Sequence, residues 1–207
     1  MSEIEWEPRF NWHEFPGDEI EALRRLESAI SGVLRQEEKF ATALDLFKWA
    51  YANTAQLRQE HPPMSEEYCS SFRTHRWTIL AAEHAALCVD NFRHSMYAVK
   101  DARGKIPTLV RKISPKDIES VLRKFDEYFP FNKAVRDNTV HPVDHRYFKY
   151  ERHHINGVLV SSSLHGQSLV MTADKQEVSL DITDETLGKL SSLRFELFEA
   201  FHDAAAR

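Results

Sequence analysis

Residues 78–92, TILAAEHAALCVDNF, decide the fold of this chain. Alanine, leucine and other apolar residues occupy most positions and are not confined to one side of a helix with 3.6 residues per turn. A helix that is apolar on most sides is usually buried at the centre of a bundle. The stretch therefore predicts a long central helix, which starts at a Ser65 cap, reaches about Asp101 and is stopped by Gly104.

An earlier helix is predicted to begin near Asp18, which can cap its first turn. Apolar residues then recur at helical spacing and predict a buried stripe. The stripe consists of Phe40, Ala43, Leu44, Phe47, Tyr51 and Leu57. Ser31-Gly32 is a candidate interruption, and His61-Pro62-Pro63 ends the helix. Residues 1–16 are interpreted as an irregular arm whose aromatic side chains pack onto the body.

Ser114-Pro115 combines a cap with a proline at the first helical position and predicts another helix start. The buried face of this helix is expected to contain Ile118, Val121, Leu122 and Phe125. Pro130 ends it, and a short helix is predicted from about Phe131 to Val140, before Pro142. Phe131, Val135 and Asn138 share one face of this short helix, which is expected to lie toward the core. Residues 18–141 are thus predicted to form a helical bundle.

The pattern changes from helix to strand after this bundle. Stretches rich in aromatic and β-branched residues occur at 146–151, 157–163, 168–173 and 177–182. Val178, Leu180 and Ile182 alternate with polar residues, and Asn156-Gly157, His165-Gly166 and Asp174-Lys175 indicate turns. We expect a small antiparallel β-meander at 146–182, inserted before a C-terminal bundle helix at 184–205 that Thr183-Asp184 opens. The apolar face of that helix holds Leu187, Leu190, Leu193, Leu197, Phe198 and Phe201. The chain is predicted to be a single, mainly α domain, 1–207.

Composition excludes several classes of protein. The hydrophobic share of 42% is typical of a globular protein, and the net charge of −5 gives no global basic field for nucleic acid. Two cysteines cannot form a disulfide framework. The N-terminus resembles no signal peptide, and no apolar stretch is long enough to cross a membrane. A cytoplasmic protein without a membrane association is expected.

The stretch AVRDNTVHP, residues 134–142, holds the main candidate site. Asp137 and His141 are four positions apart and are neighbours on one helix face, so the carboxylate can orient the imidazole. Arg136 is long enough to reach toward His141, and Asn138 can support the backbone or bind substrate. The same residues also fit an ordinary helix end, because arginine and histidine favour the C-terminus of the helix dipole.

Long helices followed by Arg136, Asp137, three further residues and His141 resemble the HEPN superfamily (higher eukaryotes and prokaryotes nucleotide-binding domains). Its hallmark is arginine, a polar residue, three residues and histidine. The resemblance implies an up-and-down helical bundle that is commonly a homodimer, with the two motifs meeting across the interface. Many members are metal-independent ribonucleases, often in toxin–antitoxin or antiviral defence systems, and others are non-catalytic interaction modules. A tyrosine two positions after the histidine occurs in one subgroup, and here that position is Val143.

The residues suit RNA cleavage without a cofactor or metal. RNA carries its own nucleophile, the 2′-hydroxyl, and a histidine of near-neutral pKa can act as general acid or base. An arginine can hold the scissile phosphate. His141 and Arg136 are therefore predicted to act in catalysis with Asp137, while Asn138, Arg76 and Arg93 are predicted to contact substrate. The alternative for the two arginines, which lie on the long central helix, is that they form helix-surface ion pairs. The expected product is a 2′,3′-cyclic phosphate. The alternatives are a dimeric interaction module without catalysis and a nucleotide-binding bundle, which would need a pocket between helices.

Two further groups of residues could carry chemistry. His84 and Cys88 are four positions apart, but their apolar surroundings favour a core histidine beside a packed cysteine over half a metal site. The stretch 100–116 is locally basic and is interpreted as a solvated loop or a guide for an RNA backbone.

Overall fold

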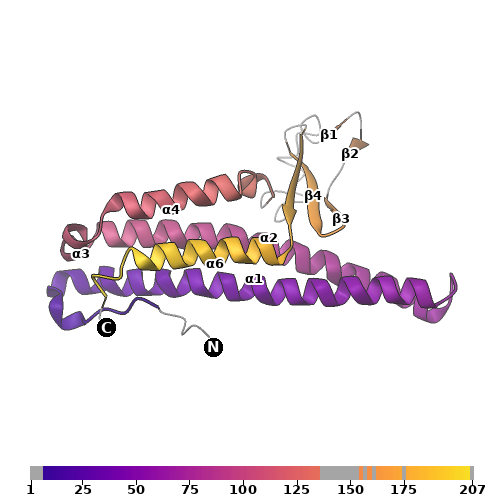
Figure 1. The fold of residues 1–207 in the computed structure, drawn as a ribbon, viewed down its shortest axis with the longest axis horizontal. Helices are drawn as coiled ribbons and strands as arrows, with labels where there is room; N and C mark the ends of the chain where they lie inside the picture. The colour runs from indigo at the N-terminus through magenta and orange to yellow at the C-terminus, as the bar shows by residue number, and fades with distance from the viewer. Residues whose placement is uncertain (1–6, 136–153, 156–157, 160–161, 174–175, 206–207) are drawn as a thin grey trace. The chain divides into compact units, whose positions relative to one another are not determined.

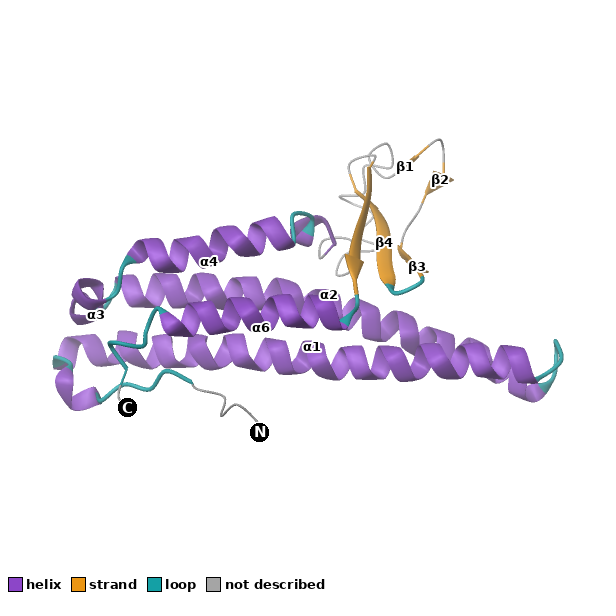
Figure 2. Ribbon diagram, viewed as in Figure 1, coloured by secondary structure: helices purple, strands orange, loops and turns teal. Residues whose placement is uncertain are grey.

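The computed structural model describes residues 7–135, 154–155, 158–159, 162–173 and 176–205. The fold is mainly α, as predicted, with a small antiparallel sheet before the C-terminal helix (Figures 1 and 2). Two long helices, α1 (Ile20–Glu60) and α2 (Glu66–Gly104), are followed by α3 (Pro107–Lys112) and α4 (Pro115–Tyr128). The C-terminal helix, α6, covers Asp184–Glu199.

The predicted helix starts follow from local capping. The Ser65 hydroxyl accepts a hydrogen bond from the backbone N–H of Tyr68 at 3.0 Å and so caps α2. Ser114 caps α4 in the same way, through the N–H of Lys116. Thr183 accepts from the N–H of Thr186 at the start of α6. The sequence signals for helix starts were therefore confirmed at all three positions.

The chain divides into two compact units that alternate along the sequence. The first unit contains residues 1–38, 91–130 and 188–207. The second contains residues 39–90 and 131–187. Helices α1, α2 and α6 each have one part in each unit.

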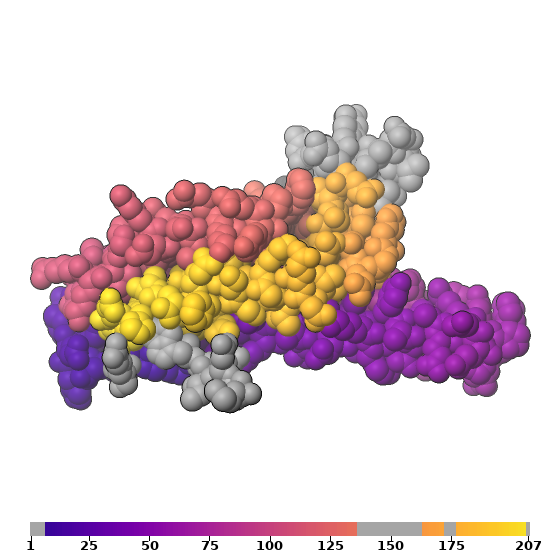
Figure 3. Space-filling model, in the orientation of Figure 1, coloured from indigo at the N-terminus to yellow at the C-terminus, as the bar shows by residue number. Residues whose placement is uncertain are grey.

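The first unit is a bundle built from parts of α1, α2 and α6 together with α4. All four residues predicted for the buried face of α4 are buried, and Phe125 stacks on Phe92 of α2 with ring centroids 6.3 Å apart. Lys124 of α4 forms an ion pair with Glu196 of α6, and Figure 3 shows these two helices side by side. Phe10 of the N-terminal arm packs edge-on against Phe201 at 6.1 Å, as expected for the arm.

The basic stretch 100–116 is mostly helical, so its interpretation as a loop was wrong. Arg103 is buried, and its guanidinium donates to the carbonyls of Val110 and Ile113, which holds the end of α3 in place. The buried Glu19 carboxylate accepts from the N–H of Thr108 at 3.3 Å and caps the start of α3. Part of this positive charge therefore has a structural role inside the first unit.

The second unit contains an antiparallel hairpin of α1 and α2. The Thr54 hydroxyl donates to the Thr74 hydroxyl at 2.9 Å, and Arg58 donates to Ser71 at 3.2 Å. Higher residue numbers on α1 therefore pair with lower residue numbers on α2, so the two helices run in opposite directions. Lys48 of α1 forms an ion pair with Asp184, at the start of α6, at 2.7 Å.

The strands of the second unit form two separate sheets among the described residues. Strands β1 (His154–Ile155) and β2 (Val158–Leu159) pair with each other. Strands β3 (Ser162–His165), β4 (Ser168–Ala173) and β5 (Gln176–Asp181) form the three-stranded meander. Gly166 adopts a φ of 62° in the β3–β4 turn, a conformation that a two-residue hairpin requires. The predicted strand at 146–151 lies outside the described residues.

The alternation predicted for β5 is confirmed by burial. Val178, Leu180 and Ile182 are all buried, and Leu169 pairs with Leu180 across β4 and β5. The end of the sheet is tied to α6, because the Thr186 hydroxyl donates to the carbonyl of Asp181 at 2.7 Å.

Three predictions about the helices were wrong. α1 continues through Ser31-Gly32, where a Cβ on Gly32 would lie 3.1 Å from Ser95 Oγ, so the glycine permits close packing against α2. Tyr51 is exposed, stacked on the outer side of the buried Phe47. The stretch 78–92 is not buried all round, since Leu80 is 60% exposed.

Candidate functional site

The residues of the candidate motif lie outside the described residues. Arg136, Asp137, Asn138 and His141 all fall in the range 136–153. The described residues that directly precede the motif in sequence are 131–135, which belong to the second unit.

The segment before the motif is anchored on α2 by a buried polar contact. After Pro130 the chain turns, and the N–H of Val135 donates to the carbonyl of Phe131 at 3.0 Å, which is helical hydrogen bonding. Asn132 Nδ2 donates to Asp90 Oδ1 at 3.0 Å, and both side chains are buried. A buried hydrogen bond to a carboxylate is directional and stronger than one between neutral groups. It fixes the start of this helix on α2, four residues before Arg136.

The burial of this segment differs from the prediction at one residue. Val135 is 2% exposed, which agrees with a core-facing position. Phe131 was placed on the same face but is 45% exposed. The reason is that Asn132, paired with Asp90, takes the buried position next to Val135.

The two arginines predicted to bind substrate have different surroundings. Arg93, in the first unit, donates through Nε to Asp126 at 2.9 Å and lies over the Tyr97 ring at 4.9 Å. That arrangement matches a helix-surface ion pair. Arg76, in the second unit, is exposed. The assignment of both to substrate stays a prediction, and Arg76 is the better placed because its charge has no partner in the described part of the chain.

The His84 and Cys88 pair is not the core pair that was expected. His84 is exposed, while Cys88 is buried. Burial raises the pKa of the Cys88 thiol to about 11, which makes it a poor thiolate and a poor metal ligand. Among the residues that the structure describes, no three side chains of His, Cys, Asp or Glu gather as a metal site would need.

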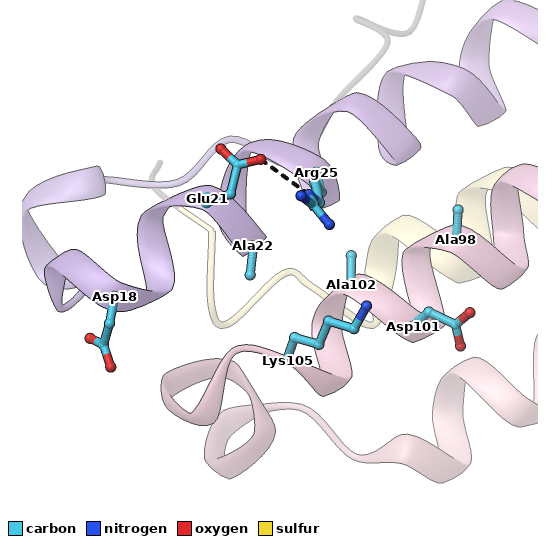
Figure 4. A pocket seen from close by; sticks show the side chains of 8 residues that line it. All are labelled: Asp18, Glu21, Ala22, Arg25, Ala98, Asp101, Ala102 and Lys105. Atoms are coloured by element: carbon cyan, nitrogen blue, oxygen red, sulfur yellow. Dashed lines mark hydrogen bonds and ion pairs between the residues drawn. The ribbon is translucent and has the colours of Figure 1, made fainter.

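A cavity of about 480 Å³ lies in the first unit, between the start of α1 and the end of α2. Its lining consists of Asp18, Glu21, Ala22, Arg25, Ala98, Asp101, Ala102 and Lys105. Figure 4 shows Arg25 turned back onto Glu21, with which it forms an ion pair at 3.1 Å. Three carboxylates against two cations do not attract a phosphate. This cavity therefore does not support nucleotide binding.

Sequence reasoning missed a group of exposed aromatic side chains in the second unit. Trp49 of α1 and Trp77 of α2 contact each other with ring centroids 5.6 Å apart, and both are nearly half exposed. The sequence did contain a signal, because Leu46 and Trp49 fall outside the apolar stripe assigned to α1. A leucine and a tryptophan that lie together on the polar side of an amphipathic helix are candidates for an interaction surface.

Comparisons of the chain with protein-family models, with curated proteins and with solved structures find no significant match. Among the described residues, neither of the long helices nor any shorter one has an apolar stretch that could span a bilayer.

Proposed function

We propose that the protein is a metal-independent endoribonuclease of HEPN type. The observation that carries the proposal is the Arg136–His141 motif, which begins four residues after the buried Asn132–Asp90 hydrogen bond. A general acid–base site needs rigid support, since small displacements of catalytic groups cost large factors in rate. The contact with α2 supplies such support at the start of the segment.

In the proposed reaction the RNA 2′-oxygen attacks the adjacent phosphorus, and the bond from phosphorus to the 5′-oxygen breaks. One histidine accepts the proton of the 2′-hydroxyl, and a second group protonates the leaving 5′-oxygen. Arg136 stabilises the negative charge that builds on the phosphate. The products are a 2′,3′-cyclic phosphate and a 5′-hydroxyl.

The proposal includes a cytoplasmic homodimer in which His141 of each copy faces the same phosphate. Two histidines then provide the base and the acid. Asp137 orients His141, while Asn138 and Arg76 contact the RNA. An antitoxin or another protein partner would restrain the activity, as the family resemblance implies.

The test is cleavage of a labelled structured RNA in EDTA by the wild type, His141→Ala and Arg136→Ala. His202→Ala is the matched control, because His202 is an exposed histidine at the far end of the chain, paired with Asp203. We expect the two motif variants to lose about 10²–10⁴-fold in rate and the control to keep full activity. Circular dichroism establishes equal folding of all preparations.

Two results would contradict this mechanism. Equal cleavage by the wild type and His141→Ala would exclude His141 as the catalyst. Cleavage that requires added Mg²⁺ would exclude a metal-free reaction. A fall in the rate on either side of neutral pH is expected if one histidine acts as base and the other as acid.

A second candidate function is an interaction module without catalysis. The exposed Trp49–Trp77 pair favours it, because exposed aromatic side chains are typical of protein interfaces. Absence of cleavage over a panel of RNAs, together with a stable protein complex, would favour this function over the ribonuclease.

A further inference from the structure

One face of the α1–α2 hairpin carries a cluster of exposed apolar side chains, which we call the tryptophan patch. It consists of Leu46 and Trp49 on α1 and of Trp77 and Leu80 on α2. Their exposed fractions are 42%, 49%, 45% and 60% in that order. Single exposed apolar residues are common on proteins, but a contiguous cluster marks an interaction site.

The four side chains lie on the same side of the hairpin. Trp49 and Trp77 are in contact, with ring centroids 5.6 Å apart. Leu46 precedes Trp49 by three residues and Leu80 follows Trp77 by three, so each leucine is a helical neighbour of its tryptophan. The helices are antiparallel, so both leucines lie at the same end of the tryptophan pair.

Two of the charged residues that flank the patch have opposite signs and are helical neighbours of the two tryptophans. Asp45 precedes Trp49 by four residues on α1, and Arg73 precedes Trp77 by four residues on α2. Residues four apart are neighbours on a helix surface. Because the helices run in opposite directions, Asp45 and Arg73 lie at opposite ends of the tryptophan pair. Both are exposed, and neither has an ion pair within the described part of the chain.

We propose that the tryptophan patch binds the same patch of a second copy of this chain. In a dimer with two-fold symmetry, residue i of one copy meets residue j of the other, and j meets i. If the two hairpins cross at the tryptophan pair and the two-fold axis passes through that crossing point, Asp45 of each copy lies next to Arg73 of the other copy. The four tryptophans then form the centre of the interface, and two ion pairs form its rim.

The size of this face fits a dimer interface. The part of α1 from Lys39 to Glu60 is about 33 Å long, and two helices side by side are about 20 Å wide. The whole face therefore covers roughly 650 Å², somewhat below the ~800 Å² that each partner contributes to a standard interface, and hairpins that cross bury its central part.

A second copy fits the patch better than an RNA does. Asp45 repels phosphates, and exposed leucines offer nothing to a nucleic-acid backbone. RNA-binding surfaces combine aromatic side chains with net positive charge, whereas Asp45 and Arg73 balance each other beside the two tryptophans. Arg76, four residues before Leu80, borders the patch and is left for RNA in the proposed ribonuclease. The patch is self-complementary in charge, which an interface between identical copies requires.

The experiment measures molar mass by light scattering after size exclusion, without RNA. The wild type is expected to run at about twice the 24.1 kDa of the chain. Asp45→Arg and Arg73→Glu should each run at 24.1 kDa, because each places like charges across the interface. Mixing these two variants should restore the dimer, since a mixed pair has both ion pairs again with reversed polarity in one of them.

Two control variants sharpen the result. Arg111→Glu makes the same charge change as Arg73→Glu at an exposed position of α3 in the first unit, and it should remain dimeric. Trp77→Ala should weaken the dimer by about 30-fold or more, the effect of losing an interface tryptophan. Circular dichroism checks that each variant is folded.

A monomeric wild type at about 50 µM, a concentration at which a standard interface of this size associates, would overturn the proposal. A mixture of the two charge variants that stays monomeric would do the same, as would a Trp77→Ala variant that dimerises like the wild type. A monomeric wild type that loses RNA binding with Trp77→Ala would assign the patch to nucleic acid instead. The proposal rests on the proposed function, because the ribonuclease site needs a homodimer, and it names the interface of that homodimer. His141→Ala should lose cleavage and still dimerise, so a failure of catalysis with an intact dimer is distinguishable from a failure of the interface.

Discussion

The two compact units use their surface side chains differently. In the first unit, long charged side chains pair with neighbours: Glu37 with Arg194, Asp126 with Arg93 and Glu119 with Lys100. In the second unit, the helical hairpin leaves two tryptophans and two leucines in solvent. Surfaces whose charges are paired within the chain stabilise a fold, whereas exposed apolar clusters indicate binding. We therefore propose structural support for the first unit and recognition for the second, whose described residues include the segment 131–135 that precedes the candidate motif in sequence.

The largest expected effect is the loss of unfolding free energy when a buried aromatic residue of the first unit is replaced, compared with an exposed aromatic residue of the second unit. Phe125→Ala removes a fully buried ring that stacks on Phe92 and should lower the free energy of unfolding by about 3–5 kcal/mol. Trp77→Ala removes a larger but half-exposed ring and should cost the monomer less than about 1.5 kcal/mol. Urea unfolding at protein concentrations below dimer formation measures both. Equal losses would show that Trp77 is part of the core.

The two units can also be compared through the loss of stability when a buried ion pair of the first unit and an exposed ion pair of the second unit are broken. Glu37→Ala leaves Arg194 without its carboxylate and removes the oxygen that accepts from the Ser191 hydroxyl at 2.6 Å, in a place where both charged side chains are largely buried. The loss should be roughly 3 kcal/mol, because an unpaired buried charge is costly. Lys48→Ala breaks the exposed pair with Asp184 in the second unit and should cost less than about 1 kcal/mol. Thermal unfolding in low and high salt distinguishes them, since only the exposed pair is screened.

Asn132→Ala tests the anchor of the motif segment. Removing one buried hydrogen bond should lower the free energy of unfolding by about 1–2 kcal/mol. If the motif is catalytic, the cleavage rate should fall as well, while RNA binding is kept. Asn132→Asp serves as the harsher variant, because it places a second carboxylate against Asp90. Unchanged stability in Asn132→Ala would show that this hydrogen bond does not anchor the segment.

The helices and their limits could be predicted from the sequence because the signals are local. Ser65, Ser114 and Thr183 cap helices through their own hydroxyls, and the prolines after His61 end α1. The buried face of α4 was predicted residue by residue, since its apolar positions recur strictly at helical spacing.

The errors arose where burial depends on distant partners. Gly32 is a local signal for a break, but its small size serves close packing against Ser95, which the sequence does not reveal. Leu80 and His84 lie in an apolar stretch, yet their face of α2 is exposed. The candidate site was predicted from a spacing pattern alone. Asp90, which holds Asn132 in the segment before the motif, is 42 positions before Asn132 in the chain, so no local pattern connects the two residues.

The smallest expected effect is a pH dependence of opposite sign in the two units. Burial raises the pKa of Glu83 in the second unit above its ordinary 4.5, so ionisation of Glu83 destabilises the fold. Its folded pKa is higher than its unfolded pKa, and stability therefore falls as the pH rises through the folded pKa. In the first unit, the hydrogen bond from Lys100 lowers the pKa of Glu119, which contributes stability above 4.5 that is lost as the pH falls through the folded pKa.

Glu83→Gln should thus raise the urea midpoint at neutral pH, whereas Glu119→Gln should lower it slightly. Both differences should shrink as the solution is acidified toward the pKa values of the two carboxyls, where the native side chains become protonated. A shift of the urea midpoint in the same direction for both variants at neutral pH would contradict the prediction. It would mean that burial of Glu83 and the hydrogen bond between Lys100 and Glu119 do not have opposite effects on stability.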